Sequence, residues 1–230
     1  MSSIVLCYRA GDSILRVIEP LYQDLARSGV DFELILVANF DEGAEDSTST
    51  YTREFAAGHD RVRAIAKAKQ GAMGWDMRAG FEAARGERMI VIDGDAQNPV
   101  DDVLRMYREM RQTGVDVMKG RRVTRLDSFY RRFISVVYNS LFFLMFWTRG
   151  LWDINGKPKG LTRSAYEQLA LRSDDWFIDA EIVIHARRAG LTIAELPVSF
   201  RTNEDRQSFV KASAIAEFLK NMFSFVIRRK

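Results

Sequence analysis

Two carboxylates and a carboxamide directly follow a strongly apolar segment in the middle of the chain. The apolar segment, Arg88–Ile92, predicts a buried strand, and Asp93, Asp95 and Gln97 come after it. Alternate residues of an extended chain point the same way, so these three side chains can present their oxygens together. Mg²⁺ and Mn²⁺ prefer oxygen ligands, commonly one or two carboxylates plus substrate phosphates. The pattern indicates either a metal site or a turn in which both carboxylates bond their own backbone.

A dense group of positive charges lies further along the chain. Six basic residues occur within 14 positions: Lys119, Arg121, Arg122, Arg125, Arg131 and Arg132. Arginine binds phosphate oxygens bidentately, and each basic residue near anionic lipid headgroups contributes about 1 kcal/mol. The apolar run Phe133–Trp147 follows at once, and Arg131 and Ser135 lie one helical turn apart. A solvated surface followed by a core helix, and a phosphate-binding surface at a membrane, both fit this pattern.

Alternating apolar and amphipathic stretches organise the first 120 residues. Strands are expected at Ile4–Tyr8, Phe32–Ala38, Val62–Ala66, Arg88–Ile92 and Val115–Met118. Helices are expected at Ser13–Ser28, Ser47–Ala57, Ala72–Ala84 and Val100–Gln112, with Ser13 as an N-cap and a kink or break at Pro20. This order predicts an α/β fold with a mostly parallel sheet and helices on both faces. Ligands of such sheets bind beyond the carboxyl ends of the strands. Four polar loops should meet there: Arg9–Asp12, Asn39–Asp46, Lys67–Gly71 and Asp93–Pro99.

The second half of the chain has a different pattern. Helices are expected at Ser128–Trp147, Ser164–Leu171, Ile178–Ala189 and Ser208–Ile227, and a loop at Leu151–Gly160. Thr192–Phe200 reads as a strand at a sheet edge, because it contains Pro197. We expect one domain over residues 1–230. Its first half, residues 1–120, would bind one ligand, and residues 121–230 would bind a second.

Composition excludes several classes of protein. The chain has 230 residues, a net charge of +3, 47% hydrophobic residues and one cysteine. These values argue against disorder and disulfides, and the small charge gives no indication of nucleic-acid binding. No secretory signal opens the chain, and the run Phe133–Trp147 is shorter than the roughly 20 residues needed to span a bilayer. A peripheral membrane contact is still compatible with two amphipathic helices, the second with an apolar stripe from Ile215 to Val226.

Several motifs occur in the order found in family 2 glycosyltransferases. Asp93-Gly94-Asp95-Ala96-Gln97 resembles the D-x-D motif, in the D-A-D-x-Q form of polyprenyl-phosphate (dolichol-phosphate) sugar synthases. Four other blocks also resemble family motifs: Lys69–Gly86, Lys119–Arg122, Asp153–Gly156 and Trp176–Glu181. The resemblance covers nearly the whole chain in register. It implies a Rossmann-like GT-A fold that binds a nucleotide-sugar, with C-terminal amphipathic helices.

The resemblance also implies roles for individual residues. Asp93, Asp95 and Gln97 would hold Mg²⁺ or Mn²⁺. Donor binding would fall to Tyr8, Asn39, Asp41, Asp46, Lys69, Gly71, Arg78, Asp93, Gly94 and Arg206. Acceptor binding would fall to Arg122, Arg131, Ser135, Asp153 and Asn155. The catalytic set would be Asp95, Arg122, Arg131 and Asp179. If Asp179 is a base, the acceptor is a hydroxyl.

The implied reaction is inverting transfer of a sugar from a nucleoside-diphosphate sugar to a polyprenyl monophosphate. A phosphate is already anionic near neutral pH, so no strong base is required. The implied location is cytoplasmic, peripheral on the inner face of the membrane. A membrane-protein partner or a homo-oligomer is compatible with the sequence.

Two positions depart from the family pattern. Ala10 stands where the family has Glu, and Asn39 replaces the first Asp of a nucleotide-binding loop that is two residues longer here. An amide donates as well as accepts hydrogen bonds, so Asn39 changes what the loop offers a base. The base, the sugar and the prenyl length are left open.

Three alternatives follow from the sequence. One is a family 2 enzyme that acts on a saccharide or protein hydroxyl. A nucleotidyltransferase is a poorer match, because it needs a Gly-rich basic loop where Arg9–Asp12 stands. A non-catalytic membrane-binding module would follow if Ala10 and Asn39 mark lost donor binding.

Overall fold

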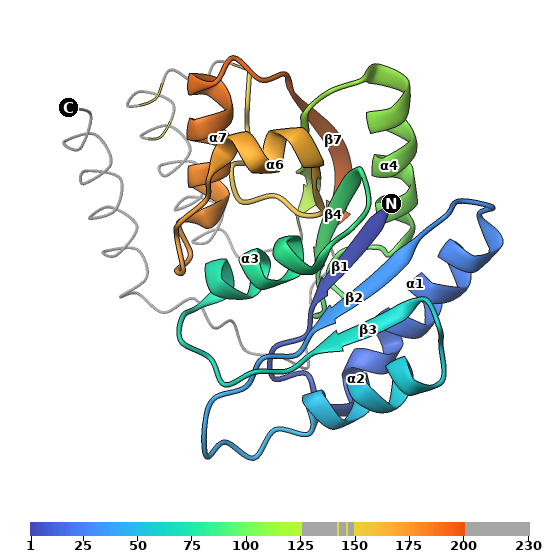
Figure 1. Cartoon of the computed structure of the whole chain (residues 1–230). Helices are drawn as coiled ribbons and strands as arrows, with labels where there is room; N and C mark the ends of the chain where they lie inside the picture. Colours follow the sequence, from blue (N-terminus) through green and yellow to red (C-terminus); the bar gives the residue numbers. More distant parts are fainter. Residues whose placement is uncertain (126–141, 143–145, 147–149, 201–230) are drawn as a thin grey trace.

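Seven strands form one sheet in the computed structural model, which describes residues 1–125, 142, 146 and 150–200 (Figure 1). Their order across the sheet is β3-β2-β1-β4-β6-β5-β7. The strands are β1 (Ser2–Leu6), β2 (Glu33–Val37), β3 (Val62–Ile65), β4 (Arg88–Asp93), β5 (Val117–Arg125), β6 (Lys159–Thr162) and β7 (Ile193–Phe200). β1 pairs in parallel with β2 and β4, and β2 with β3. The mostly parallel sheet predicted from the sequence is confirmed.

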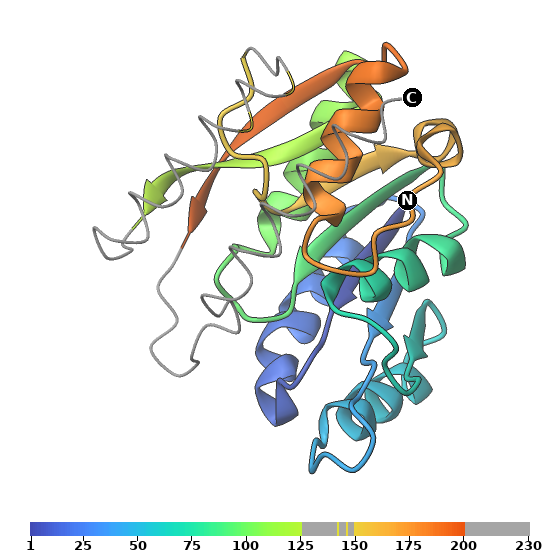
Figure 2. The same cartoon turned by 90° about the vertical axis from the view of Figure 1, so that its left-hand side faces the viewer.

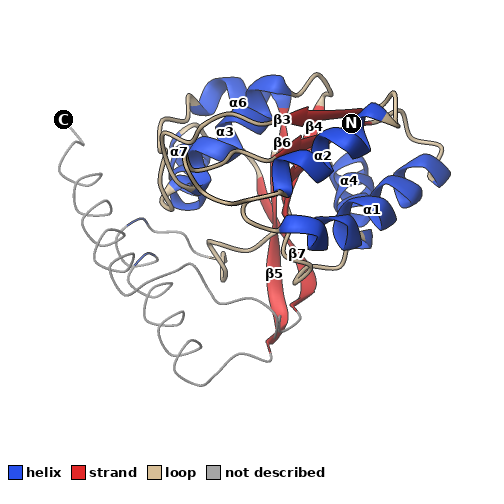
Figure 3. Cartoon of the chain, turned by 90° about the horizontal axis from the view of Figure 1, so that it is seen from below, coloured by secondary structure: helices blue, strands red, loops and turns tan. Residues whose placement is uncertain are grey.

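Helices cover both faces of the sheet (Figures 2 and 3). One face packs against α1 (Leu15–Arg27), α2 (Thr48–Ala57) and α4 (Asp101–Thr113), and the other against α3 (Met73–Ala83), α6 (Arg163–Leu169) and α7 (Ile178–Arg188). A hydrophobic core lies on each face of the sheet. Neighbouring residues of β1 point into different cores, Val5 into the one with α1, α2 and α4 and Ile4 into the other. Burying both faces explains why these strands are continuous apolar runs.

The strand β6 was not expected, because its residues lie at the end of a predicted loop and just beyond it. β6 runs antiparallel to both β4 and β5. An antiparallel strand starts where its neighbours end. Residues 153–158, which precede β6, therefore lie beside the carboxyl ends of the parallel strands, where the ligand is expected. β5 is also longer than predicted, because it pairs with β7 as far as Arg125.

The start of the first helix differs from the prediction. A short 3-10 turn, η1 (Gly11–Ile14), precedes α1, and the Ser13 hydroxyl donates to the Ala10 carbonyl instead of capping the helix. Pro20 lies within α1, which continues through it. Its ring is on the exposed side of the helix, where water can bond the carbonyl that loses its partner. The predicted cap and break are therefore wrong.

Most elements of the second half lie close to their expected positions. Thr162 accepts a hydrogen bond from the Ala165 N–H and caps α6. β7 is an edge strand, as Pro197 predicted. The helices expected at 128–147 and 208–227 lie outside the described residues, apart from two phenylalanines. Phe142 is fully buried with Ile184 of α7, and its ring lies 4.8 Å from that of Phe146. At Phe142 the core interpretation is the correct one.

Candidate active site

The carboxyl ends of β1, β2, β3 and β4 meet at one edge of the sheet (Figure 1). The loops that follow these strands are the four that the sequence pattern brings together. An isolated parallel bridge between Phe40 and Ala68 extends the pairing of β2 with β3 into this region. The site is therefore assembled from strand ends that the sheet holds in fixed register.

Tyr8 and Asp41 form the first contact of the predicted donor site. The Tyr8 hydroxyl donates to Asp41 Oδ2 at 2.6 Å, and Arg9 donates to the same oxygen at 2.7 Å. The Tyr8 hydrogen bond and the Arg9 guanidinium hold the pKa of the Asp41 carboxyl below its usual value. Burial and the hydrogen bond to Asp41 raise the pKa of Tyr8 to about 12. Asp41 is therefore an ionised hydrogen-bond acceptor near neutral pH.

Lys69 lies between Tyr8 and a carboxylate that the sequence analysis did not single out, Asp76 on α3. Its ammonium is ion-paired with Asp76 and lies 4.2 Å from the centre of the Tyr8 ring, in a cation–π contact. Asn39 donates to the other Asp76 oxygen at 2.8 Å and accepts the Lys67 N–H at 3.0 Å. Burial raises the pKa of Asp76, while Lys69 and Asn39 oppose that rise. Asp76 thus ties the ends of β2 and β3 to α3.

Three other predicted donor residues make contacts within the protein. Asp46 accepts from the Thr48 N–H at 3.0 Å, which orients the start of α2. Arg78 pairs with Asp174 at 2.6 Å, so its guanidinium holds the segment before α7 against α3. A Cβ on Gly71 would lie 2.9 Å from the Asp174 carbonyl oxygen, so this close approach needs glycine. Their donor-binding roles stay predictions.

The turn after β4 contains the predicted metal ligands. Asp95 Oδ1 accepts the Gln97 N–H at 3.0 Å, and Ala96 has a φ of 61°. Gly94 packs tightly, because a Cβ there would lie 2.8 Å from the carbonyl oxygen of Leu6. Of the two carboxylates in the turn that the sequence left open, Asp95 therefore bonds its own backbone, and its side chain is half-buried.

Asp93 is half-buried at the end of β4, close enough to Lys157 and Asp179 to sense their charges. Burial raises the pKa of Asp93, and the Lys157 ammonium opposes that rise. Within the described residues, no cluster of three or more His, Cys, Asp or Glu side chains could hold a metal alone. Asp93 and Asp95 provide two carboxylates, which suits a cation that takes its other ligands from substrate phosphates. The residues present therefore fit Mg²⁺ or Mn²⁺.

The predicted acceptor side begins with a forked ion pair. Arg122 on β5 donates from Nε to Asp153 Oδ2 and from Nη2 to Oδ1, both at 2.7 Å. Burial raises the pKa of Asp153, but the Arg122 guanidinium outweighs it and holds the pKa below its usual value. A cavity of about 310 Å³ opens beside the pair, lined by Arg121, Arg122, Val123, Trp152 and Asp153. Trp152 is 69% exposed and Val123 56% exposed.

The loop that carries Asp153 packs closely against β5. A Cβ on Gly156 would overlap the carbonyl oxygen of Gly120, so two glycines let the backbones cross. Asn155, a predicted acceptor residue, has a buried Oδ1 with no hydrogen-bond partner in the described structure. The contact with Gly120 therefore sets how closely the loop approaches β5 at residue 156.

Asp179, at the start of α7, lies in a buried ionic cluster. Its carboxylate is 2% exposed and accepts two hydrogen bonds from Lys157 at 2.7 Å and a further one from Lys159. Burial raises the pKa of Asp179, but the two ammonium groups outweigh it and hold the pKa below its usual value. Burial lowers the pKa of Lys159 to about 7, against the attraction of Asp179. A carboxylate held this way is a weak base.

Lys119 does not belong to the exposed basic cluster that the sequence suggested. It is fully buried and ion-paired with Glu195 on β7. Burial lowers its pKa, and Glu195 opposes the effect. Three further predicted site residues, Arg131, Ser135 and Arg206, lie outside the described residues.

Sequence reasoning missed four charged residues around the site: Asp76, Lys157, Lys159 and Glu195. A signal existed for three of them. Asp76 falls on the buried face of α3 with Gly80, and Lys157 and Lys159 flank Pro158, so that as alternate residues they can point the same way. Nothing local marks Glu195, whose partner is distant in sequence.

Comparison with solved structures shows that this fold is GT-A. Glucosyl-3-phosphoglycerate synthase from Mycobacterium tuberculosis, solved with Mn²⁺, UDP and phosphoglyceric acid, superposes with a TM-score of 0.74 over 99% of this chain and 77% of that one, at 16% identity. Mannosyl-3-phosphoglycerate synthase from Rubrobacter xylanophilus gives 0.74 over 99% and 74%, at 13% identity. The predicted fold is confirmed.

The chain belongs to glycosyltransferase family 2, whose family model matches residues 2–169. This membership confirms the resemblance and sets aside the nucleotidyltransferase alternative. The glycosyltransferase AglD of Haloferax volcanii is 30% identical over 182 residues, 76% of this chain and 28% of that protein.

Two further relatives are named for polyprenyl-phosphate substrates. A dolichyl-phosphate beta-glucosyltransferase of Trichomonas vaginalis is 24% identical over 85% of this chain and 62% of its own length. An undecaprenyl-phosphate 4-deoxy-4-formamido-L-arabinose transferase of Proteus mirabilis is 29% identical over 61% and 42%. The relatives thus include the polyprenyl-phosphate branch. The chain spans less than two thirds of the length of each of the three.

Proposed function

We propose that this chain transfers a sugar from a nucleoside-diphosphate sugar to the phosphate of a polyprenyl monophosphate, with inversion at the anomeric carbon. The observation that carries the proposal is the buried ion-pair cluster of Asp179 with Lys157 and Lys159. A hydroxyl acceptor has to lose a proton, and a general base works best when its pKa is near the working pH. A phosphate acceptor needs no such base.

The chemistry follows from that choice of acceptor. An oxygen of the acceptor phosphate forms a bond to the anomeric carbon, and the bond from that carbon to the nucleoside diphosphate breaks. Arg122 would orient the acceptor phosphate and offset its charge. Arg131 and Ser135, which the sequence predicts as further acceptor-binding residues, would bind the same phosphate. Holding both reactants in line accounts for much of the rate, through proximity and charge compensation.

The donor would bind at the ends of β1 to β4. Tyr8, Asp41 and Lys69 offer an aromatic ring, a carboxylate and an ammonium at one place. Mg²⁺ or Mn²⁺, held by Asp93 and Asp95 with Gln97, would supply neutralisation of the charge on the leaving diphosphate. Asn39 is occupied by Lys67 and Asp76, so it would act by holding the ends of β2 and β3 against α3.

The location we propose is peripheral, on the cytoplasmic face of a membrane. Trp152 and Val123 expose apolar surface beside Arg121, a combination suited to the boundary between headgroups and acyl chains. None of the helices in the part of the chain that the structure describes combines the length and hydropathy that a bilayer-spanning helix needs. A membrane-protein partner or self-association stays a prediction.

The test is an acceptor screen with the purified chain. UDP- and GDP-sugars labelled in the sugar would be supplied with Mg²⁺ or Mn²⁺, together with undecaprenyl phosphate, dolichyl phosphate, or a set of saccharides and phosphoglycerate. We expect label in the lipid extract and equimolar release of one nucleoside diphosphate. Transfer only to a hydroxyl would replace this function with the saccharide or protein alternative. If calorimetry detects no binding of any nucleotide-sugar, the chain would instead be a non-catalytic module.

A further inference from the structure

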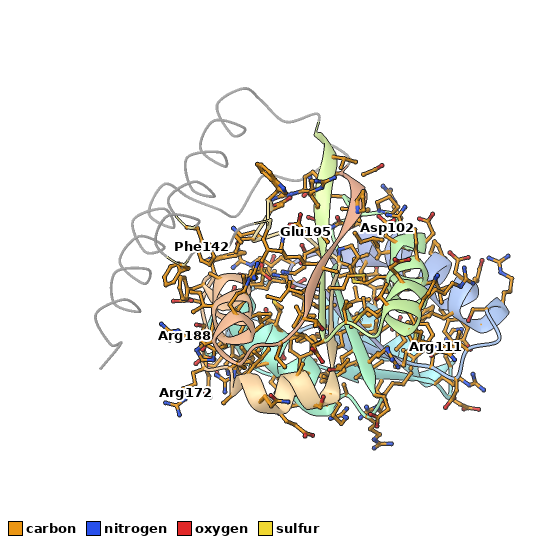
Figure 4. The ribbon with its side chains drawn as sticks, turned by 90° about the horizontal axis from the view of Figure 1, so that it is seen from above. Asp102, Arg111, Phe142, Arg172, Arg188 and Glu195 are labelled. Atoms are coloured by element: carbon orange, nitrogen blue, oxygen red, sulfur yellow. The ribbon has the colours of Figure 1, made fainter. Side chains whose placement is uncertain are left out.

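Glu195 and Lys119 form a buried pair across two neighbouring strands. Glu195 is labelled on β7 in Figure 4, and it lies opposite Lys119 of β5 in the parallel register. The Lys119 side chain is 0% exposed and that of Glu195 10% exposed, and their charged groups are in contact. Charges are removed from water at high cost unless they are paired and hydrogen-bonded. The surroundings of the pair show what else these groups bind.

Both members of the pair form hydrogen bonds with the start of the loop of residues 152–156. Glu195 Oε1 accepts the Trp152 N–H at 2.8 Å and the Asp153 N–H at 3.4 Å. Lys119 Nζ donates to the Asp153 carbonyl oxygen at 2.7 Å. The carboxylate thus accepts the N–H groups of two successive residues, and the ammonium donates to the carbonyl oxygen of the second. The loop start is fixed to β5 and β7 by charge-assisted hydrogen bonds.

The Asp153 side chain connects the loop, held in this way, to Arg122. In addition to the two fork contacts, Asp153 Oδ2 accepts the Arg122 backbone N–H at 3.2 Å. The guanidinium also lies 5.1 Å from the centre of the Phe200 ring on β7. Its plane is therefore set by one carboxylate and one ring, and the carboxylate is in turn set by Glu195 and Lys119.

We propose that Glu195 and Lys119 are positioning residues for acceptor binding, acting through Asp153 on Arg122. The inference rests on the proposed function, because Arg122 is there the arginine that meets the acceptor phosphate. Neither positioning residue touches the substrate. Their effect is to hold a guanidinium where a phosphate oxygen arrives, and a misplacement of about 1 Å in such a contact can cost roughly 100-fold.

The test compares Glu195→Ala with Glu195→Gln. An amide oxygen can still accept the Trp152 N–H, whereas alanine cannot. We expect Glu195→Ala to raise the KM for undecaprenyl phosphate about 10- to 100-fold with little change in the KM for the nucleotide-sugar, and Glu195→Gln to recover part of the loss. In an Arg122→Lys background, Glu195→Ala should raise the acceptor KM no further, since both changes act through one contact.

A matched control is Glu33→Gln. Glu33 is a part-buried ion-paired carboxylate at the opposite end of the sheet, where it binds Arg63. This change should lower stability while leaving both KM values unchanged. Hydrogen exchange gives a readout that does not depend on turnover: residues 151–156 should exchange faster in Glu195→Ala than in wild type or in Glu33→Gln.

The outcomes separate this inference from the proposed function. Faster loop exchange together with a selective rise in acceptor KM supports it. Unchanged loop exchange, or an equal rise in both KM values, overturns it while transfer to undecaprenyl phosphate by the wild type stands. If the wild type transfers no sugar to any polyprenyl phosphate, the proposed function fails, and the exchange experiment still decides whether Glu195 fixes the loop.

Discussion

Asn39 donates a hydrogen bond from Nδ2 to Oδ1 of Asp76 at 2.8 Å. Both residues are almost fully buried, at 1% and 3% exposure. Since the Asn39 oxygen accepts the Lys67 N–H, both halves of the amide are engaged inside the protein. A carboxylate at position 39 would face Asp76 with no proton to donate. The amide and the carboxylate therefore fit one another as a pair.

The pairing predicts the outcome of an exchange between these two positions. Asn39→Asp should destabilise the fold by about 1–3 kcal/mol, because it leaves a buried acceptor without a donor beside a like charge. The double variant Asn39→Asp with Asp76→Asn restores one donor and one acceptor and should recover most of that loss. Urea unfolding of the two single variants and the double variant measures this coupling. Additive losses would contradict the pairing.

Asp95→Asn separates the two roles open to Asp95. An amide oxygen can still accept the Gln97 N–H, so the turn and the melting temperature should be preserved. Activity should fall about 10²- to 10³-fold, as expected when charge stabilisation at the leaving group is lost. Mn²⁺ titration in the presence of UDP should show weaker binding. Asp101→Asn, at an exposed carboxylate at the start of α4, is the control and should retain wild-type activity and Mn²⁺ affinity. Full activity in Asp95→Asn would remove this residue from the metal site.

Asp179→Asn should destabilise the protein by about 3–5 kcal/mol, because it leaves two buried ammonium groups without their carboxylate. Asp174→Asn provides the comparison. Asp174 also pairs with a basic residue, Arg78, but its side chain is 50% exposed, so its loss should cost about 1 kcal/mol or less. Thermal and urea unfolding measure both. Similar small losses at the two sites would show that the cluster is not essential to the fold.

Lys159 makes stability depend on pH in a defined window. Its pKa falls from 10.5 to about 7 on folding, mainly because of burial. Between these values the unfolded chain binds a proton that the folded chain does not, so this group adds stability as pH rises. Relative to Lys159→Met, the wild type should gain up to about 1.4 kcal/mol per pH unit above pH 7. Unfolding free energies from pH 6 to 9.5 check this. A difference that is constant with pH would show that Lys159 stays charged.

Trp152→Ala should weaken binding to vesicles that contain anionic lipid, because it removes exposed apolar surface beside two arginines. A reduction of about tenfold corresponds to 1.4 kcal/mol, below the value of a fully buried aromatic side chain. Stability should change little at this exposed position. Arg111→Gln on α4, labelled in Figure 4, removes a charge elsewhere and should bind vesicles as the wild type does. Unchanged binding of Trp152→Ala would place the membrane contact on another surface.

The first half of the fold could be predicted because its signals are local. Apolar runs such as Phe32–Ala38 and the helices between them are written in consecutive residues, and the parallel order follows from their alternation. The helix start was mispredicted because Ser13 bonds backward to Ala10. The strand β6 was missed because only four residues form it, two of them glycine and lysine, and its pairing partners β4 and β5 both lie distant in the sequence.

The sequence predicted which loops form the candidate site, but it predicted few of the contacts between their side chains. The sequence brought Tyr8, Asp41 and Lys69 to one edge, and the structure finds them in contact. It could not show that Lys119 is buried, because a lysine in a basic run looks like a surface residue until a distant strand supplies Glu195. Pairing of this kind depends on tertiary structure, and no window of local sequence contains both partners.

The crossing of Gly120 and Gly156 bears on how this protein could be redesigned. Two main chains touch there with no side chain between them, so any added carbon would push the loop of residues 153–158 away from β5. Libraries aimed at new acceptors would therefore do better to leave that junction untouched and diversify the rim at Val123 and Trp152, where bulk can change without moving the main chain.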